Sequence, residues 1–476
     1  MQDAGFGVDG LGLEKLYQHV DEQFEAHLKK IRVYLRQPSI SADGTGMMET
    51  AEITKGFIEE VGGHGEIVST DGWPVVYGEL FAGNDKKTLL IYGMYDVQPV
   101  DEDRWSVPPF EAKIVDMKPF GKCLVARGAI NTKGPLRAFF NALETILEVE
   151  GELPVNLIFV IEGEEELGSI HLPQFVNKYI DKLKRADAMY FPIPSQDRKR
   201  KVEMFLGVKG IIYMDLICRG GDWGGPTEVG IHSSNAAWVD SPVWRLLWAL
   251  TSMKSPDGKI LIEGFYDDIR EPTPSEIEMI KKIVKTFDEE TIKEQIKVKR
   301  FIDDLHGEEL IKRYLFSPTL NIDGIIAGYT GPGTKTVLPH EILAKIDIRL
   351  VPNMDTEDII RKFKDHLRKH GFEDIEVKVH DCYPWAYTSI EEEVVQALIR
   401  TYRKHGYEPE IWPWLGGSAP FYLFNRDPLN LPFVDGGLGH GGRAHSPDEY
   451  FVVQGIKDFE KSVITFLYEY SRENRV

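Results

Sequence analysis

Apolar residues recur at helical spacing near the start of the chain, and short apolar runs follow at intervals. The pattern over residues 11–35 predicts an amphipathic helix that stops before Pro38. Thr88–Tyr92 and Val155–Ile161 have the length and composition of buried strands, and between them an apolar face after Pro135 predicts a helix. This strand–helix–strand order predicts an α/β layer with a largely parallel sheet, whose carboxyl-end loops are the usual place for ligands.

The pattern changes character after about residue 209. Ile211–Ile217 is typical of a strand, a glycine-rich stretch follows it, and Ser241–Pro242 predicts the start of another helix. Ile342–Leu350 alternates like a half-buried strand, and Thr356 is expected to cap a helix that ends at Gly371. Together with a strand at residues 375–379, these elements predict a separate unit of sheet and helix.

The last ninety or so residues resemble the first part of the chain and look like a continuation of the first domain. A helix is expected from Ser389 to Gly406, and a final helix from about Phe459. We therefore expect a catalytic domain built from residues 1–209 and 386–476, with a second domain inserted at residues 210–385.

Composition narrows the class of protein. The 476 residues carry 56 Lys plus Arg against 76 Asp plus Glu, a net charge of −20, which argues against nucleic acid and anionic membranes as partners. Three cysteines without paired spacing support neither a disulfide framework nor a thiolate zinc site. No signal sequence or run of membrane-spanning length stands out, so we expect a cytoplasmic protein.

Two adjacent glutamates, Glu165 and Glu166, follow the predicted strand Val155–Ile161 directly. Neighbouring carboxylates at a strand end repel each other unless a metal ion or a shared proton offsets their charge. A solvated acidic loop is the alternative interpretation. The motifs found elsewhere in the chain favour a catalytic or metal-binding role for this pair over a solvated loop.

Short motifs spread over the whole chain resemble, in the right order, those of the dinuclear-zinc aminoacylase and carnosinase-type dipeptidase family, which includes glutamate carboxypeptidases and succinyl-diaminopimelate desuccinylases. Each motif alone is weak, and their agreement in order is what carries the resemblance. The matching segments are residues 93–99, 126–135, 162–166, 231–233, 349–352, 416–420 and 444–446.

The resemblance implies a zinc-exopeptidase-like catalytic domain and an inserted α+β lid and dimerisation domain. It implies that Glu165 is the general base, that Glu166 and His445 are metal ligands, and that His232 of a second copy stabilises the oxyanion. It also implies a substrate-carboxylate pocket. The residues matching that pocket are Arg349, Gly416, Gly417 and Ser418.

The sequence departs from the family at three metal-ligand positions. Met94 stands where the family has a histidine, Asn131 where it has the bridging aspartate, and Pro192 lies in the segment where another aspartate is expected. A thioether and a neutral amide are poor substitutes beside carboxylates and imidazoles. We therefore expect at most one zinc-like ion, held by Glu166, His445 and the oxygen of Asn131. His440, Asp187 and Asp197 are conceivable substitute ligands.

Two classes of function follow from these motifs. We favour a hydrolase of amide bonds in small carboxylate-bearing substrates, of the dipeptidase or N-acyl-amino-acid deacylase type, with an atypical metal-poor centre and Glu165 as base. The alternatives are a non-catalytic relative that binds a small molecule, and an enzyme with changed, metal-independent chemistry. In each case we expect a homodimer and a small-molecule ligand.

Overall fold

The computed structural model describes residues 12–472 of the chain, and these residues form two compact units. Unit 1 contains the described residues up to Leu206 together with Tyr387–Trp412 and the residues from Leu423 onward. Unit 2 contains Gly207–Ala386 and Pro413–Tyr422. Segment 413–422, which we expected within the second part of the catalytic domain, belongs with unit 2.

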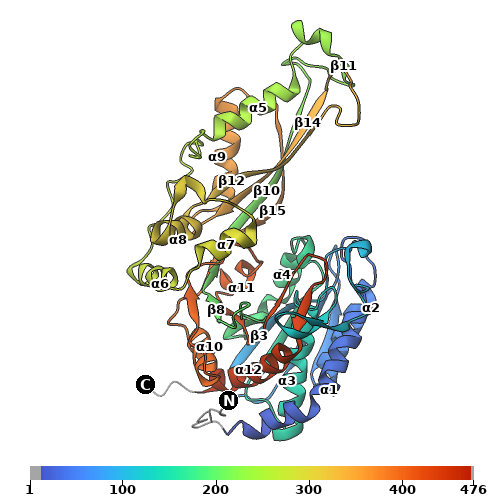
Figure 1. The fold of residues 1–476 in the computed structure, drawn as a ribbon, viewed down its shortest axis with the longest axis vertical. Helices are drawn as coiled ribbons and strands as arrows, with labels where there is room; N and C mark the ends of the chain where they lie inside the picture. The colour runs from blue at the N-terminus through green and yellow to red at the C-terminus, as the bar shows by residue number, and fades with distance from the viewer. Residues whose placement is uncertain (1–11, 473–476) are drawn as a thin grey trace. The chain divides into compact units, whose positions relative to one another are not determined.

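A six-stranded sheet forms the centre of unit 1 (Figure 1). Its β3, β6, β7 and β18 run parallel, whereas β1 and β2 join the edge in antiparallel pairs. All seven residues of β6 are buried, as expected for a strand covered on both faces. The strands, in sheet order, are β1 (His64–Val68), β2 (Val75–Leu80), β6 (Asn156–Glu162), β3 (Thr88–Met94), β7 (Ala188–Pro192) and β18 (Phe433–Gly436).

Three long helices pack together in unit 1, and Figure 1 shows them side by side. They are α1 (Glu14–Arg36), α3 (Lys133–Glu150) and α12 (Val453–Ser471). Phe57 of α2 joins this layer by contacting Tyr34 of α1 and Phe140 of α3, whereas α4 packs on Tyr77 of β2. The remaining helices of unit 1 are α2 (Met47–Glu60), η1 (Glu102–Arg104), η2 (Glu165–Leu167), α4 (Leu172–Leu183), α10 (Glu393–Lys404) and α11 (Tyr422–Asn425), whose first residue is assigned to unit 2.

A smaller four-stranded sheet in unit 1 brings the C-terminal motif to the loop before α3. Its β20 pairs with β5, so that Tyr450 lies opposite Val125 and the loops that follow β5 and precede β20 meet. The sheet contains β19 (Gly441–Gly442), β20 (Tyr450–Val452), β5 (Gly121–Val125) and β4 (Lys113–Met117), and a separate parallel pair joins β17 (Glu410–Trp412) to β8 (Glu203–Phe205).

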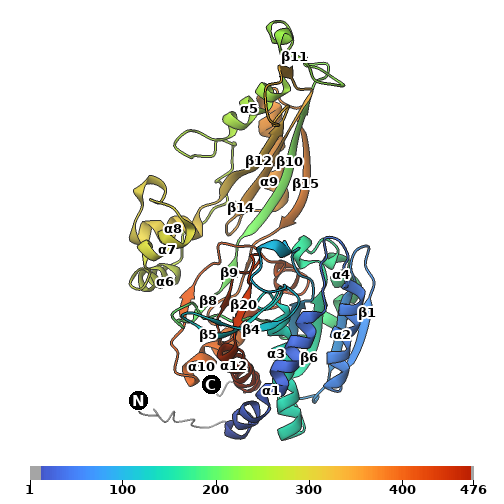
Figure 2. The same ribbon diagram turned by 45° about the vertical axis from the view of Figure 1, so that its right-hand side comes forward.

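Unit 2 is built on a four-stranded antiparallel sheet (Figure 2). One face is apolar and forms a single core with the buried sides of α5 and α9, whereas the other face carries polar residues such as Asp215 and Asp347. This one-sided burial explains the alternation seen in residues 342–350. In sheet order the strands are β12 (Thr319–Ala327), β14 (Glu341–Leu350), β10 (Gly210–Arg219) and β15 (Glu376–Tyr383).

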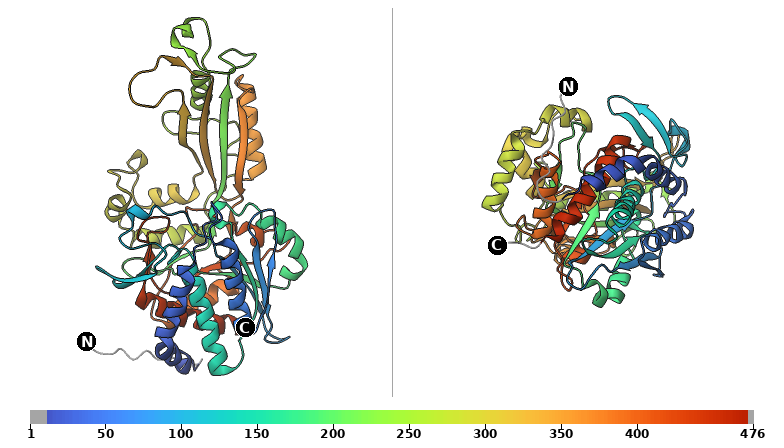
Figure 3. Two further views of the ribbon diagram at one scale, coloured as in Figure 1. Left: turned by 90° about the vertical axis from the view of Figure 1, so that its right-hand side faces the viewer. Right: turned by 90° about the horizontal axis from the view of Figure 1, so that it is seen from below.

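Helices and short strands complete unit 2, and Figure 3 shows α9 lying along the sheet. The helices are α5 (Pro242–Met253), α6 (Pro274–Val284), α7 (Glu289–Ile296), α8 (Gly307–Phe316) and α9 (Thr356–Lys369), with η3 (Ser233–Ala237) and η4 (Ile302–Asp304). The short strands are β9 (Gly207–Val208), β11 (Ile231–His232), β13 (Val337–Leu338) and β16 (Ala386–Tyr387), the last of which ends in unit 1.

Several helix starts differ from the predicted ones. Asp355, rather than Thr356, caps α9 by accepting the N–H of Asp358, because Thr356 is already the first helical residue. Ser389 caps a turn before α10, which begins four residues later, at Glu393. The final helix begins at Val453, six residues before Phe459, since residues 450–452 enter it directly from β20. None of the helices within residues 12–472 combines the length and apolar character needed to cross a membrane.

Candidate functional site

The carboxyl ends of β3 and β6 place an acidic cluster at one edge of the unit 1 sheet. The strands are parallel, with Met94 opposite Glu162, so the residues that follow each strand meet at the same edge. The buried carboxylate of Asp96 accepts the backbone N–H of Glu165 at 3.3 Å and that of Glu166 at 3.0 Å. Asp96 thus fixes the backbone of the glutamate pair.

The carboxylate of Glu166 is almost fully enclosed, with 3% of its side chain exposed. Its Oε1 accepts a hydrogen bond from Asn131 Nδ2 at 2.8 Å, and its Oε2 accepts one from Gln98 Nε2 at 2.8 Å. Oε2 also lies 3.1 Å from Nε2 of His445, which belongs to the loop before β20. The structure therefore brings together the predicted residues Asn131, Glu166 and His445, and adds Gln98.

Glu449 holds the loop that carries Asn131, a role that the sequence analysis missed. This fully buried carboxylate accepts hydrogen bonds from Arg127 and from the backbone N–H groups of Gly128, Ile130 and Asn131, at 2.9–3.1 Å. Its position four residues after His445 is the signal that could have identified it. Glu449 couples the C-terminal motif to the entrance of α3.

Burial and crowding set the charges of the cluster. Burial, with Glu166 and Asp96 nearby, holds the pKa of Glu165 well above its usual value. Burial and Glu166 likewise raise the pKa of Asp96 to about 7. The hydrogen bond to Glu166 raises the pKa of His445, which favours a donating imidazolium. Within residues 12–472, the Glu165 carboxyl makes no hydrogen bond or ion pair and is left available to a ligand.

The predicted carboxylate pocket lies in unit 2. Arg349 on β14 donates from Nη1 to the hydroxyl of Ser418 at 2.9 Å, and its Nε lies 3.4 Å from Asp347. A side chain at Gly416 would collide with the hydroxyl of Tyr314, because a Cβ there would be 2.2 Å from it. The structure thus places Arg349, Gly416, Gly417 and Ser418 in one unit, with Arg349 in contact with Ser418.

Lys209 adds a second cation to this region. Its backbone N–H donates to the carbonyl of Gly417, and its buried Nζ donates to the carbonyls of Tyr314 and Ser317. Burial and the nearby Arg349 lower the pKa of Lys209 to about 8. This lysine lies in a Gly-Val-Lys-Gly motif at the domain boundary, but no local pattern marks it as a site residue.

His232 occupies β11 of unit 2 and is exposed. Its Nδ1 interacts with the hydroxyl of Ser234 at 2.9 Å and its Nε2 with the hydroxyl of Thr336 at 3.1 Å. Both contacts are local to unit 2. They orient the ring within unit 2.

The suggested substitute ligands do not join the cluster. Asp187 accepts the N–H of Thr88 at the opposite, amino-terminal end of β3. Asp197 accepts the N–H groups of Lys199 and Lys201 within its own turn, and His440 contacts the carbonyl of Gln196 and the hydroxyl of Tyr450. These residues are therefore corrected from possible ligands to structural ones.

The side chains present do not fit a resident zinc ion of the family type. Among residues 12–472 there is no group of three or more His, Cys, Asp or Glu side chains arranged to hold a metal. Met94 is buried at the end of β3, and β7 ends at Pro192. Of the residues that match the family's metal ligands, the described part of the chain keeps the Glu166 carboxylate and the His445 imidazole, whereas catalytic zinc sites use about three protein ligands.

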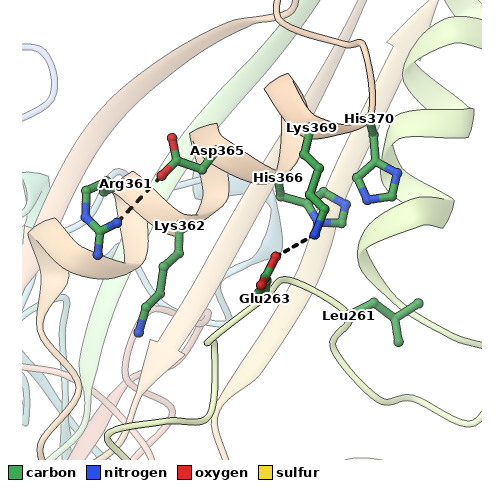
Figure 4. Close-up of a pocket in the computed structure, with 8 residues that line it drawn as sticks. All are labelled: Leu261, Glu263, Arg361, Lys362, Asp365, His366, Lys369 and His370. Atoms are coloured by element: carbon green, nitrogen blue, oxygen red, sulfur yellow. Dashed lines mark hydrogen bonds and ion pairs between the residues drawn. The ribbon is translucent and has the colours of Figure 1, made fainter.

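A cavity of about 240 Å³ lies elsewhere in unit 2, beside α9 (Figure 4). Its charged side chains mostly pair with one another, as Lys369 does with Glu263 and Arg361 does with Asp365. His366 stacks on His370, and burial lowers the pKa of His366 to about 4. No predicted site residue lines this cavity, so it is not part of the candidate site.

Comparison with known proteins identifies the family. The model described as "Peptidase family M20/M25/M40" matches residues 90–469. The chain belongs to this peptidase family. The resemblance drawn from the motifs and the mixed α/β fold with a mostly parallel central sheet are thereby confirmed, and the protein is placed among hydrolases.

Similar proteins are dipeptidases and a carboxypeptidase. The chain is 29% identical to the Cys-Gly metallodipeptidase dug1 of Schizosaccharomyces pombe, over 96% of this chain and 98% of that protein. It is 34% identical to the human Beta-Ala-His dipeptidase over 62% of this chain and 56% of that protein. An M20 family metallo-carboxypeptidase from Sulfolobus solfataricus has 37% identity and a TM-score of 0.86, covering 94% and 99% of the two chains.

Proposed function

We propose that the protein hydrolyses the amide bond of small substrates that carry a free carboxylate, such as dipeptides and N-acyl amino acids. Its relatives are named for activity on Cys-Gly and β-Ala-His, which supports a dipeptide as the first substrate class to examine. The observation that carries the proposal is the Glu165 carboxyl, which is half-buried, has no hydrogen-bond or ion-pair partner within residues 12–472, and is fixed through its backbone to Asp96.

Glu165 is suited to proton transfer. A carboxylate whose pKa is raised above its usual value is a stronger base, so it can take a proton from an attacking water molecule and return it to the leaving amine. Burial and the neighbouring carboxylates supply that rise, whereas Asp96 prevents the glutamate pair from moving apart. Glu165 would therefore act as the general base and then as the general acid.

Recognition of the substrate carboxylate is assigned to unit 2. Arg349 and Ser418 provide charged and neutral donors in direct contact, and a guanidinium can bind a carboxylate through two parallel hydrogen bonds. Lys209 adds positive charge to the same region. The ion pair between Arg349 Nε and Asp347 Oδ1 is long, at 3.4 Å. The guanidinium therefore keeps N–H donors for a ligand.

A homodimer is part of the proposal. Strand β12 is an edge strand whose Ile322, Ile325 and Ile326 are exposed, and an exposed apolar edge is a template for pairing with another copy. Helix α5, which like β12 packs on β14, exposes Trp244 and Trp248. A second copy seated there would cover these side chains, and its His232 would supply the oxyanion donor.

The enclosed Glu166 favours one second candidate, a non-catalytic relative that binds the same class of molecule. A carboxylate already satisfied by Asn131, Gln98 and His445 needs no metal ion to stabilise its charge. Such a protein would keep the carboxylate pocket around Arg349 without turnover. We expect at most one divalent ion per chain under either candidate.

A panel of dipeptides and N-acyl amino acids separates the two candidates. Amine release would be measured with purified protein, and the melting temperature would be measured with the same compounds. Turnover that depends on a free substrate carboxylate supports the hydrolase. A rise in melting temperature without turnover would support the binding protein, and neither effect with any compound would contradict both.

A further inference from the structure

We infer that side-chain N–H groups of Asn131, Gln98 and His445 take the place of metal ions around Glu166, so that this centre is metal-free by construction. Where the proposed function allows at most one divalent ion per chain, this centre would hold none. The inference concerns the same site as the proposed hydrolase, but its test does not depend on turnover.

The Asn131 amide points its nitrogen at the Glu166 carboxylate. Nδ2 lies 2.8 Å from Glu166 Oε1, which is a normal hydrogen-bond distance from an amide donor to a carboxylate. Turning the amide round would place its oxygen against that carboxylate, an arrangement that needs a cation or a proton between the two oxygens. Glu166 therefore selects the donating orientation, and the Asn131 oxygen does not face this ligand position.

The remaining oxygen of Glu166 is also occupied. Gln98 Nε2 donates to Oε2 at 2.8 Å, and the amide of Gln98 lies 3.3 Å from the Glu166 carbonyl as well. His445 presents Nε2 to the same Oε2 at 3.1 Å. Its Nε2 also lies 3.0 Å from Asn131 Nδ2, a contact in which only one of the two nitrogens can donate. A divalent ion would have to displace these contacts before it could bind.

The same trio of residue types recurs in the core of unit 1. Oε1 of the fully buried Glu460 accepts Asn141 Nδ2 at 2.7 Å, and its Oε2 lies 2.8 Å from Nδ1 of His27. There, between α1, α3 and α12, the trio joins three helices and has no solvent-facing role. Asparagine and histidine side chains thus hold a buried glutamate carboxylate in this fold without a metal ion, and the centre at Glu166 has the same contacts with Gln98 added.

Gln98 and Asn131 are accordingly positioning residues that act through Glu166. Asp96 completes the compensation, because its carboxylate is bonded to the backbone N–H groups of Glu165 and Glu166. The cluster contains several carboxylates, yet protein donors satisfy Asp96 and Glu166. A cation at Glu166 would cost the hydrogen bonds that Asn131 and Gln98 donate and the contact with His445.

The test measures zinc binding by elemental analysis and by melting temperature, with zinc chloride or a chelator as the probe. Wild-type protein is expected to retain fewer than about 0.1 zinc ions per chain through Glu166, and zinc or chelator should leave its melting temperature unchanged. About one ion per chain that Glu166→Gln removes would overturn the inference.

The variant Asn131→Asp is expected to gain a zinc site. It replaces the donor with a carboxylate beside Glu166 and His445, so zinc should bind at about one ion per chain and raise the variant's melting temperature by roughly 5 °C. Adding Glu166→Gln to this variant should abolish both effects. If Asn131→Asp folds and gains no zinc, its amide is not what excludes the ion, and the inference fails.

Should Asn131→Asp not fold, Gln98→Glu places a carboxylate against Glu166 from the Oε2 side. It should gain the same zinc-dependent rise, again lost with Glu166→Gln. Absence of any gain in this folded variant counts against the inference in the same way. The wild-type measurement requires no variant and stands by itself.

Discussion

Asn131 donates its side-chain amide to the carboxylate of Glu166 at 2.8 Å, at the entrance to helix α3. This contact joins two positions that the sequence separates by 35 residues. Through it, an amide N–H stabilises the negative charge of the Glu166 carboxylate within the acidic cluster.

Asp96→Asn tests the support beneath the glutamate pair. An amide offers one oxygen where the carboxylate offers two, so a backbone N–H of Glu165 or Glu166 loses its acceptor. We expect a loss of about 1–3 kcal/mol in the free energy of unfolding, measured by denaturant titration. Asp116→Asn, at an exposed position of β4, is the matched control. Equal effects of both changes would remove the supporting role of Asp96.

Arg349→Met tests the carboxylate pocket. Methionine keeps the aliphatic stem but removes the guanidinium that contacts Ser418, so kcat/KM for a dipeptide should fall about 10- to 100-fold. The loss should be much smaller for the same dipeptide with an amidated C-terminus. Arg219→Met, which removes an exposed arginine from neighbouring β10, is the control. An equal loss for both substrates would show that Arg349 does not read the carboxylate.

Ile326→Asp tests the dimer. The side chain is 64% exposed on edge strand β12, and a charge there should prevent pairing with a second copy at little cost to the fold. Light scattering should report a dimer for the wild type and a monomer for the variant. Phe81→Asp, at a position 68% exposed in unit 1, should stay dimeric. A monomeric wild type would remove the oxyanion role proposed for His232.

The pH dependence of stability can be tested at Glu276, the capping-box residue of α6. Burial alone would raise its pKa, but hydrogen bonds from Arg270 and the N–H of Thr273 outweigh burial and hold the pKa below its usual 4.5. A lowered folded-state pKa gives stability that is present above pH 4.5 and is lost as the pH falls through the folded pKa.

Glu276→Gln should therefore destabilise the protein at pH 7, and the difference from the wild type should shrink on acidification below pH 4.5. Denaturant unfolding over this pH range provides the measurement. Glu278→Gln, an exposed change on the same helix, should have little effect at pH 7. A difference from the wild type that stays constant with pH would contradict the assignment.

The sequence predicted much of the fold because strand and helix patterns were strong where burial is one-sided or complete. The fully buried β6 and the half-buried β14 both appear as predicted. Helix starts were less predictable, as at Asp355, because adjacent polar residues compete for the cap. The exposed β12 was missed since its apolar residues lack the alternation that a buried face imposes.

The residues of the candidate site that lie in sequence motifs could be predicted, but the contacts between them could not. The motifs identified Glu165, Glu166, Asn131 and His445, and the structure brings the last three into contact. Gln98, Lys209 and Glu449 act through contacts with residues distant in sequence, which no local pattern records. Their roles, like the catalytic roles of the predicted residues, stay predictions until variants are measured.

The central claim is that Glu165 carries the proton in amide hydrolysis. Glu165→Gln keeps the size of the side chain but removes its ability to accept a proton, and Glu150→Gln changes an exposed glutamate of α3 as a control. On the best dipeptide of the panel, we predict that kcat falls by about 10²- to 10⁴-fold in Glu165→Gln, with an unchanged melting temperature. Wild-type kcat in a folded Glu165→Gln variant would contradict the account.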